Sequence, residues 1–531
     1  MPILAGWLTG EQVPQDIIQQ TLLTMGEVLG AHGGTPARTV QPGAGLMAYA
    51  DTAYAMQRND EPPVLDWVPD RHTLVYRRPL SGLHPLYYIE NWPAEGNLLF
   101  ASEIKALLSL GVPRRLHLPA LDALLRYGFI PAPWTVFKDI YVVPAGSIMR
   151  WQHAKTVVNH ATDYHIDEPL ASTDLQDRLH SLLDEAVAGM LPSHEQLVAL
   201  TGGDTPSALS TILASHHTSA SFNVASIGYK KSLSAKAWRG AEHIAEACQR
   251  PFLAITGVDQ PEFWASTLAT LEAPAVDTRP VVLHQLLHTA ANETQARIAI
   301  SGLGAHTLLA SAPQAFLHED AQQDILHRYS QTVPLSRSRS DSASSLWSSD
   351  VANQMQKEET WEDTLHARKL VRQAAKFSDP RLGWYYLNLH LRLPDFTVSM
   401  AQQIAIQELM TIRTPYLGAQ VMEMLTRLPP TLDDEVAKIA LLDQLAQRYI
   451  PDSTSTSSLL RLSGPITSLQ RVADSELLQQ TISTEAIKAA GIFNPQTVEK
   501  LLHEKITGAN RRELLLVFTT QLLCQLFGLA L

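Results

Sequence analysis

The spacing of apolar residues divides the chain into a β-rich first part and a second part in which strands and helices alternate. Before about residue 165, short apolar runs separated by turn residues predict strands. The runs are Met1–Leu8, Thr73–Tyr76, Leu86–Ile89 and Ser147–Trp151. Two segments, Pro14–Leu29 and Ser102–Leu110, have the pattern of helices, and Ser102 is a candidate N-cap.

From about residue 172 the pattern changes. Helical spacing over Asp174–Met190 is followed by a short apolar run, Gln196–Leu200, a Gly-Gly turn and another helix. The alternation continues with Ser221–Ile227, a helix around Ala237–Ala247, and Arg297–Ile300. Such alternation implies a parallel sheet. Beyond about residue 355 nearly every segment has a helical pattern. We therefore expect two domains, 1–165 and 172–531, of overall α/β class.

Composition narrows the class of protein. Of 531 residues, 45% are hydrophobic and 18% are charged, which is ordinary for a globular chain. The net charge is 41 − 53 = −12, which disfavours a protein that coats nucleic acid or anionic membrane. The two cysteines, Cys248 and Cys524, exclude a disulfide framework and a Cys-based zinc site. A reducing compartment, the cytoplasm, is expected.

Three segments have other compositional biases. The apolar tail Leu514–Leu531 contains two threonines and two glutamines, so a buried helix is expected there rather than a membrane span. Ser336–Ser349 and Ser453–Ser458 are rich in serine and are interpreted as loops.

Motifs along the whole chain carry a resemblance. Within Ser81–Leu108, the order G-x-x-P-L-Y-Y followed by F-A-S-E-x-K-A-L-L resembles the N-terminal domain of the asparagine synthetase family. Further similar segments keep the family's order: Tyr127–Pro131, Pro144–Gly146, Leu200–Leu209, Ile300–His306, Ser399-Met400, Arg413–Gly418 and Lys438–Leu441. The resemblance implies an Ntn-hydrolase-type glutaminase sandwich followed by a PP-loop α/β synthetase domain with a helical C-terminal region.

The N-terminus departs from that family. Glutaminase members place a cysteine directly after Met1, whose thiol attacks the glutamine amide while its own α-amine acts as base. Here the second residue is Pro2, which has no nucleophilic side chain. The segment comparable to the family's glutamine-binding loop reads Gly33–Arg38 (GGTPAR) and lacks its arginine–glycine–proline–aspartate pattern. Glutaminase activity is therefore not expected.

The nucleotide loop departs as well. In the family, Ser-Gly-Gly backbone N–H groups cradle pyrophosphate, and an Asp two residues later helps to bind Mg²⁺. The corresponding residues here are Thr201, Gly202, Gly203, Asp204, Thr205, Pro206 and Ser207. Thr205 stands where the resemblance places the carboxylate, and Pro206 lacks an N–H. Thr205-Pro206 is instead a favourable N-cap–N1 pair for a helix. In the alternative interpretation Asp204 takes the metal.

The second phosphate and metal segment is also changed. Ser301, Gly302 and Gly304 match the family's SGEG pattern, but Leu303 replaces its glutamate, and His306 and Thr307 replace an Asp-Glu pair. No metal site is therefore expected. Lys438 matches a family lysine that contacts phosphate, which makes it the one candidate catalytic residue. It could equally be an ordinary helix lysine with a packed stem.

Other chemically active side chains receive structural interpretations. His284 and His288 share a helix face, but no acidic third ligand adjoins them in sequence, so surface or packing roles are favoured. His216-His217 is interpreted as a solvated turn. The aromatic run Trp384–Tyr386 is assigned to the core.

Two functional hypotheses remain open. In the first, the chain is a pseudoenzyme that acts as a structural or binding subunit with a protein partner or as a homodimer. It would then need no cofactor, and weak ATP binding could persist. In the second, the chain is an active, ammonia-independent ligase similar to β-lactam synthetases and lasso-peptide cyclases. Asp204, Thr201, Ser301 and Lys438 would then carry the chemistry.

Overall fold

A computed structural model describes most of the chain. The described residues are 3–11, 13–30, 36–49, 64–171, 173–192, 195–202, 204–229, 234–318, 324–332, 346–429, 434–450 and 464–531. Five sequence predictions lie wholly or partly outside them: those on Pro2, on Gly33–Thr35 of the segment compared with the glutamine-binding loop, on Gly203, on residues 336–345 of the first Ser-rich segment, and on the second Ser-rich segment.

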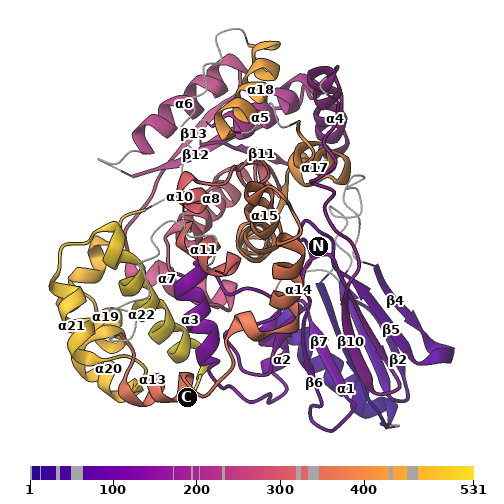
Figure 1. The fold of residues 1–531 in the computed structure, drawn as a ribbon, viewed down its shortest axis with the longest axis vertical. Helices are drawn as coiled ribbons and strands as arrows, with labels where there is room; N and C mark the ends of the chain where they lie inside the picture. Colours follow the sequence, from indigo (N-terminus) through magenta and orange to yellow (C-terminus); the bar gives the residue numbers. More distant parts are fainter. Residues whose placement is uncertain are drawn as a thin grey trace.

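The N-terminal part is a sandwich of two antiparallel sheets (Figure 1). The larger sheet has the order β2-β3-β1-β7-β6-β8. Its strands are β2 (Pro36–Gln41), β3 (Ala44–Tyr49), β1 (Ile3–Leu8), β7 (Leu98–Ala101), β6 (Tyr87–Glu90) and β8 (Tyr141–Val142). The smaller sheet has the order β10-β9-β5-β4. Its strands are β10 (Lys155–His160), β9 (Ser147–Gln152), β5 (Thr73–Arg77) and β4 (Val64–Val68), with the short η2 (Pro69–Arg71) between β4 and β5.

Alternation along β1 explains how this sandwich is filled. Leu4 and Leu8 belong to the apolar layer between the two sheets, together with Tyr76 and Trp151 of the smaller sheet. The alternate residues of β1 face the opposite side, where helix α1 (Gln15–Leu29) covers the larger sheet. A Cβ on Gly45 would lie 2.3 Å from Ile18 of α1, so this glycine permits the close approach of helix and sheet.

The second part contains a parallel sheet with the order β13-β12-β11-β14-β15. Its strands are β13 (Phe252–Thr256), β12 (Asn223–Gly228), β11 (Leu197–Leu200), β14 (Ile298–Ile300) and β15 (Thr411–Arg413). The chain moves outward from β11 through β12 to β13, and then returns to the other side of β11 to form β14. Figure 1 shows helices α5 and α6 above this sheet and α8 below it.

Helices make up the rest of the described chain. Those before residue 333 are α2 (Ile104–Leu108), α3 (Leu118–Tyr127), α4 (Leu175–Met190), α5 (Thr205–His217), α6 (Ser234–Ala247), α7 (Pro261–Leu271), α8 (Arg279–Thr294), α9 (Ala305–Leu308), α10 (Gln314–His318) and α11 (Ile325–Thr332). Those after residue 345 are α13 (Ser349–Met355), η3 (Trp361–Asp363), α14 (Leu365–Ala374), α15 (Pro380–Leu387), the π-helix η4 (Asn388–Val398), α16 (Ser399–Gln407), η5 (Pro415–Leu417), α17 (Ala419–Thr426), α18 (Glu435–Gln447), η6 (Thr467–Gln470), η7 (Val472–Asp474), α19 (Glu476–Ile482), α20 (Thr484–Ala490), α21 (Pro495–His503) and α22 (Gly508–Phe527).

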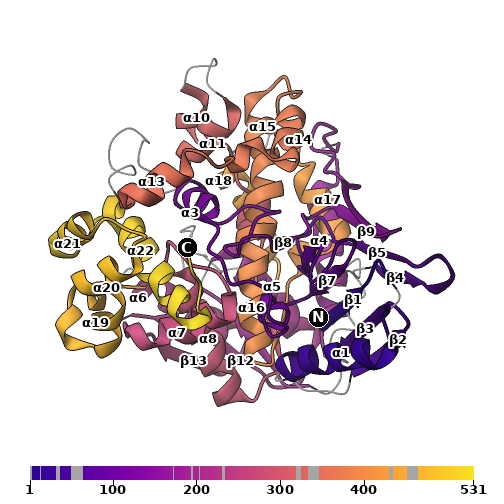
Figure 2. The same cartoon turned by 90° about the horizontal axis from the view of Figure 1, so that it is seen from below.

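The last four helices, α19 to α22, gather at one end of the molecule, where α22 packs on α7 (Figure 2). Residues 514–518 of α22 are fully or almost fully buried, which confirms the predicted buried helix for the first part of Leu514–Leu531; α22 ends at Phe527, and Leu526 and Leu531 are exposed. Among the described helices, none combines the length and apolar character that crossing a bilayer requires.

The two parts are joined by hydrogen bonds that run between them. The buried carboxylate of Glu272 accepts the backbone N–H groups of Ile104 at 2.7 Å and Lys105 at 2.6 Å, which lie at the start of α2. Asp395 of η4 accepts the Ala132 N–H at 2.8 Å, and the indole N–H of Trp361 donates to the Ala132 carbonyl at 2.9 Å. A cavity of about 110 Å³ lies at this interface. The predicted domain division at residues 165–172 falls between β10 and α4 and stays a prediction.

Two local predictions are wrong. Ser102 is not the N-cap of α2: Glu103 precedes that helix, and the Ser102 hydroxyl accepts the Leu4 N–H at 3.2 Å instead. The end of the first Ser-rich segment is not a loop, since Leu346 and Trp347 are buried and Ser348 caps α13. Trp347 stacks on Phe493 with ring centroids 5.2 Å apart, which holds this end against the C-terminal helices.

Candidate functional site

Two loops meet at the carboxyl ends of the neighbouring strands β11 and β14. Val198 pairs with Ala299 and Ala199 pairs with Ile300 in parallel register, so the loops that follow the two strands leave the sheet side by side. A Cβ on Gly302 would lie 2.6 Å from the Ser207 nitrogen, which shows how closely the loops pack. The strand order reverses between β11 and β14, and in open α/β sheets ligands bind at such a switch point.

Asp204 begins the helix that follows the first loop. It is the N-cap of α5, and its carboxylate accepts the Ser207 N–H at 3.4 Å and also the Ser207 hydroxyl. The prediction that Thr205 is the N-cap is therefore wrong by one residue, and Thr205 and Pro206 occupy the first helical turn. Thr201 and Ser207 share a hydrogen bond of 2.8 Å between their hydroxyl oxygens.

His306 of the second loop forms an ion pair with the first. Its Nε2 lies 3.1 Å from Asp204 Oδ2, and its Nδ1 lies 3.9 Å from Glu435 Oε1. Burial disfavours the charged imidazole, but the hydrogen bond to Asp204 and the charges of Asp204 and Glu435 outweigh burial and raise the pKa of His306 to about 9. Burial likewise opposes the charge of Asp204, and His306 and Ser207 overcome it and lower that pKa. A protonated imidazole is thus the cation that faces Asp204.

Helix α18 closes over the two loops. Besides Glu435 it contributes Asp443, whose Oδ1 accepts the Thr205 hydroxyl at 2.8 Å. Lys438 donates from Nζ to the Ala310 carbonyl at 3.2 Å and lies 5.2 Å from the centroid of the Tyr385 ring. The lysine is partly buried, and its ammonium group is held by the segment that follows α9.

The structure brings most of the proposed nucleotide-binding residues together. Thr201, Asp204, Thr205 and Ser207 surround the start of α5, and Ser301 Oγ accepts the Leu303 N–H at 3.2 Å in the facing loop. Gly202, Gly302 and Gly304 form the backbone of the two loops, and Gly304 has the positive φ of +87°. Sequence reasoning missed Glu435 and Asp443, which lie more than 100 residues from the loops; no local signal marks them. The roles of all these residues stay predictions.

The remaining histidine predictions have mixed outcomes. An acidic side chain does adjoin the pair on α8: Glu408 lies 2.8 Å from His284 Nε2 and 3.0 Å from His288 Nδ1. That carboxylate is 120 or more residues away in sequence, which is why it was not recognised. His216-His217 is not a turn but the last turn of α5, where His217 Nε2 lies 2.7 Å from Asp184. Trp384–Tyr386 is buried, as predicted.

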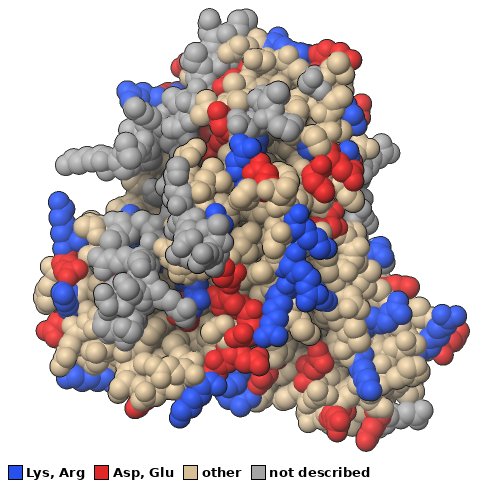
Figure 3. All heavy atoms as spheres, viewed as in Figure 1, with Lys and Arg blue, Asp and Glu red and all other residues tan. Residues whose placement is uncertain are grey.

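Charge is mixed on the face drawn in Figure 3. A blue strip lies over α14, whose exposed basic residues are Arg368, Lys369 and Arg372, and acidic side chains lie beside it. The prediction that the chain does not bind nucleic acid rests on its net charge and stays a prediction.

Comparisons with known proteins address the family. The sequence model described as asparagine synthase matches residues 178–526, and the model described as a glutamine amidotransferase domain matches residues 65–164. A search of curated proteins gave no match. Among solved structures, the chain is similar to NMN synthetase from Francisella tularensis at 12% identity, covering 42% of this chain and 93% of that one with a TM-score of 0.21. The asparagine synthase match spans about two thirds of the sequence, and the chain belongs to the asparagine synthase family.

Proposed function

We propose that this chain is a catalytically degenerate member of its family that acts as a structural or binding subunit. The ion pair between His306 and Asp204 is the observation that carries the proposal. For working members of the family, the resemblance implies that magnesium and the ATP phosphates bind at these loops. Here an imidazole with a pKa of about 9 already balances the Asp204 carboxylate, and Glu435 flanks it on the other side.

The electrostatics support weak nucleotide binding. A magnesium ion that entered beside the His306 imidazolium would meet a like charge. The Asp204 and Glu435 carboxylates on either side of the imidazolium offset part of that repulsion, so the ion pair weakens metal binding mainly because it occupies the Asp204 carboxylate. Thr205 supplies a hydroxyl in place of a carboxylate, and it is engaged with Asp443. We therefore infer that residual ATP binding is weak and insensitive to Mg²⁺.

The first domain supports the same proposal. Pro2, which lies outside the described residues, offers no nucleophile for glutamine hydrolysis. The sandwich nevertheless has an apolar layer between its sheets and packs on the second part through Glu272, Asp395 and Trp361. A domain of this kind serves as a structural body, and a protein partner or a second copy of the chain would bind to its surface.

Calorimetry with ATP, with and without Mg²⁺, tests the proposal. The expected result is weak or no binding with no gain from the metal. Lys438→Met is the matched variant: it should leave this result unchanged, because the Lys438 ammonium is held by Ala310 and Ser311. Micromolar binding that requires Mg²⁺ and is lost in Lys438→Met would overturn the proposal and favour the active ligase. ATP–pyrophosphate exchange is the second assay, and an adenylated molecule that co-purifies with the chain would also overturn the proposal.

A further inference from the structure

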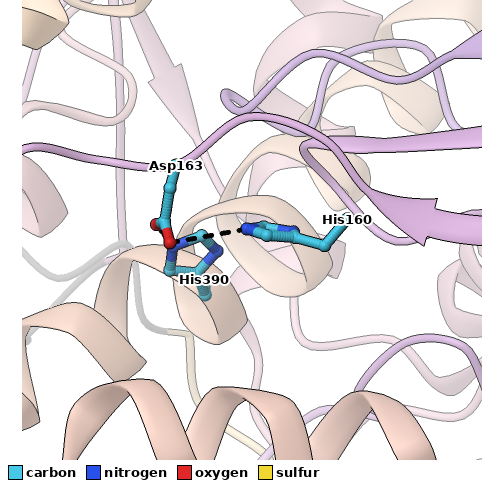
Figure 4. Close-up of side chains that lie close together, drawn as sticks. All are labelled: His160, Asp163 and His390. Atoms are coloured by element: carbon cyan, nitrogen blue, oxygen red, sulfur yellow. Dashed lines mark hydrogen bonds and ion pairs between the residues drawn. The ribbon is translucent and has the colours of Figure 1, made fainter. Parts of the chain in front are cut away.

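Three metal-ligating side chains converge where the N-terminal sandwich meets the helical part. His160 is the last residue of β10, Asp163 lies three residues later, and His390 comes from the π-helix η4. Within the described residues, this is the one group of three such side chains whose ligand atoms all lie within 4.8 Å of one another. Figure 4 shows the three side chains facing a common point from these separate segments. None of the three side chains belongs to the loops that follow β11 and β14.

The distances suit a small divalent ion. His390 Nε2 lies 2.8 Å from Asp163 Oδ1, and His160 Nε2 lies 3.6 Å from Asp163 Oδ2. Two nitrogen or oxygen ligands about 2.0–2.1 Å from a tetrahedral metal are about 3.4 Å apart. The two histidines approach different oxygens of the Asp163 carboxylate, at separations on either side of that value, so coordination requires rotation of the side chains about a common ion.

His160 supplies the second observation. Both of its ring nitrogens are buried and have no hydrogen-bond partner, since 3.6 Å is too long for a hydrogen bond. A buried polar atom without a partner is unfavourable and calls for an explanation. Coordination through Nε2 would satisfy one of these nitrogens, whereas the ordinary interpretation, a structural His390–Asp163 hydrogen bond, leaves both of them unexplained.

The surroundings favour coordination. Asp163 is held in place by the Tyr386 hydroxyl, which donates to Oδ2 at 3.1 Å, and by the Tyr164 N–H, which donates to Oδ1 at 2.8 Å. Ligand carboxylates of metal sites are supported by such outer hydrogen bonds. Asp163 is 30% and His160 is 24% exposed, so the site lies near the surface.

We propose that His160, Asp163 and His390 form a binding site for a divalent transition-metal ion, Zn²⁺ in particular. Two imidazoles and one carboxylate are ligands that Zn²⁺ commonly takes, with the fourth position open to water. The bound ion would connect β10 of the sandwich to η4 of the second part. The site needs neither ATP nor glutamine chemistry and is independent of the function proposed above.

Zinc titration of the full-length chain, freed of metal by a chelator, tests the site. Calorimetry should give one Zn²⁺ per chain, and Co²⁺ should give the visible absorption of a tetrahedral centre. His160→Asn and His390→Asn each remove a ligand and should weaken Zn²⁺ binding by about 100-fold. Loss of an outer hydrogen bond weakens metal binding by about 10–100-fold, and loss of a ligand should reach at least the upper end of that range. Tyr386→Phe, which removes only an outer hydrogen bond, should weaken it by about 10-fold.

His288→Asn is the matched control. His288 and His284 both contact the Glu408 carboxylate, so they form a second arrangement of two histidines and one carboxylate. The ring centroids of His284 and His288 are 6.4 Å apart, whereas those of His160 and His390 are 5.4 Å apart. This variant should bind Zn²⁺ like the wild type. If circular dichroism shows that His390→Asn does not fold, the test relies on His160→Asn, because His160 is partly exposed. Wild-type binding weaker than millimolar, unchanged binding in His160→Asn, or loss of binding in His288→Asn would each overturn the proposal.

Discussion

Replacing His306 by glutamine should lower the stability of the chain in a pH-dependent manner. The folded-state pKa of about 9 lies above the value of 6.5 for a free histidine, so the folded state binds the proton more tightly than the unfolded state. The stabilisation from this proton is therefore complete below about pH 6.5 and is lost as the pH rises through 9. Wild type and variant should differ most in mildly acidic buffer and converge in alkaline buffer.

The size of the effect follows from the same two values. A difference of 9 − 6.5 = 2.5 corresponds to about 3.4 kcal/mol. The His306 side chain is 31% exposed, and solvent screening reduces the interaction, so we expect about 1–2 kcal/mol. That stabilisation should be lost between the pKa of the free histidine and that of the folded state.

Urea unfolding followed by tryptophan fluorescence at a series of pH values measures this difference. The matched background is Asp204→Asn, which keeps the shape of the cap but removes the charge that His306 faces at 3.1 Å. In that background the His306→Gln substitution should lose much of its pH dependence. A difference between wild type and variant that is constant with pH, or that grows toward alkaline pH, would refute the assignment of a protonated imidazole.

Three further predictions concern the joint between the two parts and the N-terminus. Glu272→Ala should lower the free energy of unfolding by about 2–4 kcal/mol in urea titrations, because two N–H groups at the start of α2 lose their acceptor; Glu272→Gln keeps an acceptor and should lose clearly less. Gly82→Ala should lose about 2–4 kcal/mol in the same assay, since its φ is +81° and a Cβ would lie 2.3 Å from Pro394. Gly111→Ala is its control, with a φ of +84° but open space, and an equal loss in both would contradict the close-contact argument. Pro2→Cys should release no glutamate from glutamine above a buffer blank, and measurable release would show that a glutamine-binding segment is present after all.

Local patterns were sufficient for most of the fold. The helix expected over Pro14–Leu29 is α1, and the run Gln196–Leu200 is β11, because periodic burial of apolar side chains is written into a few consecutive residues. The two Gly-containing loops could be placed at neighbouring strand ends for the same reason, since each follows a short apolar run.

Tertiary contacts determine the features that local sequence patterns could not predict. Ser102 has the chemistry of an N-cap, but its hydroxyl is taken by Leu4, and the N–H groups of α2 are satisfied by Glu272 from 167 or more residues away. The His160–Asp163 spacing is visible in sequence, but His390 is 227 residues from Asp163 and has no local signature as a ligand. The sequence was sufficient to name candidate residues in the two loops, but not the distant side chains that contact them.

The late position of α18 in the chain sets an order of events during synthesis. Glu435 lies 435 − 306 = 129 residues beyond His306, and Thr205 and its partner Asp443 are 238 residues apart. At about 5–20 residues per second, a ribosome needs on the order of 12–48 s to cover that interval. During that time β11 and the start of α5 can have left the ribosome while Thr205 has no Asp443 and His306 has no Glu435. The first loop therefore acquires its full set of partners only near the end of translation, and a truncation before residue 435 would leave a sheet whose switch-point loops lack the helix that closes over them.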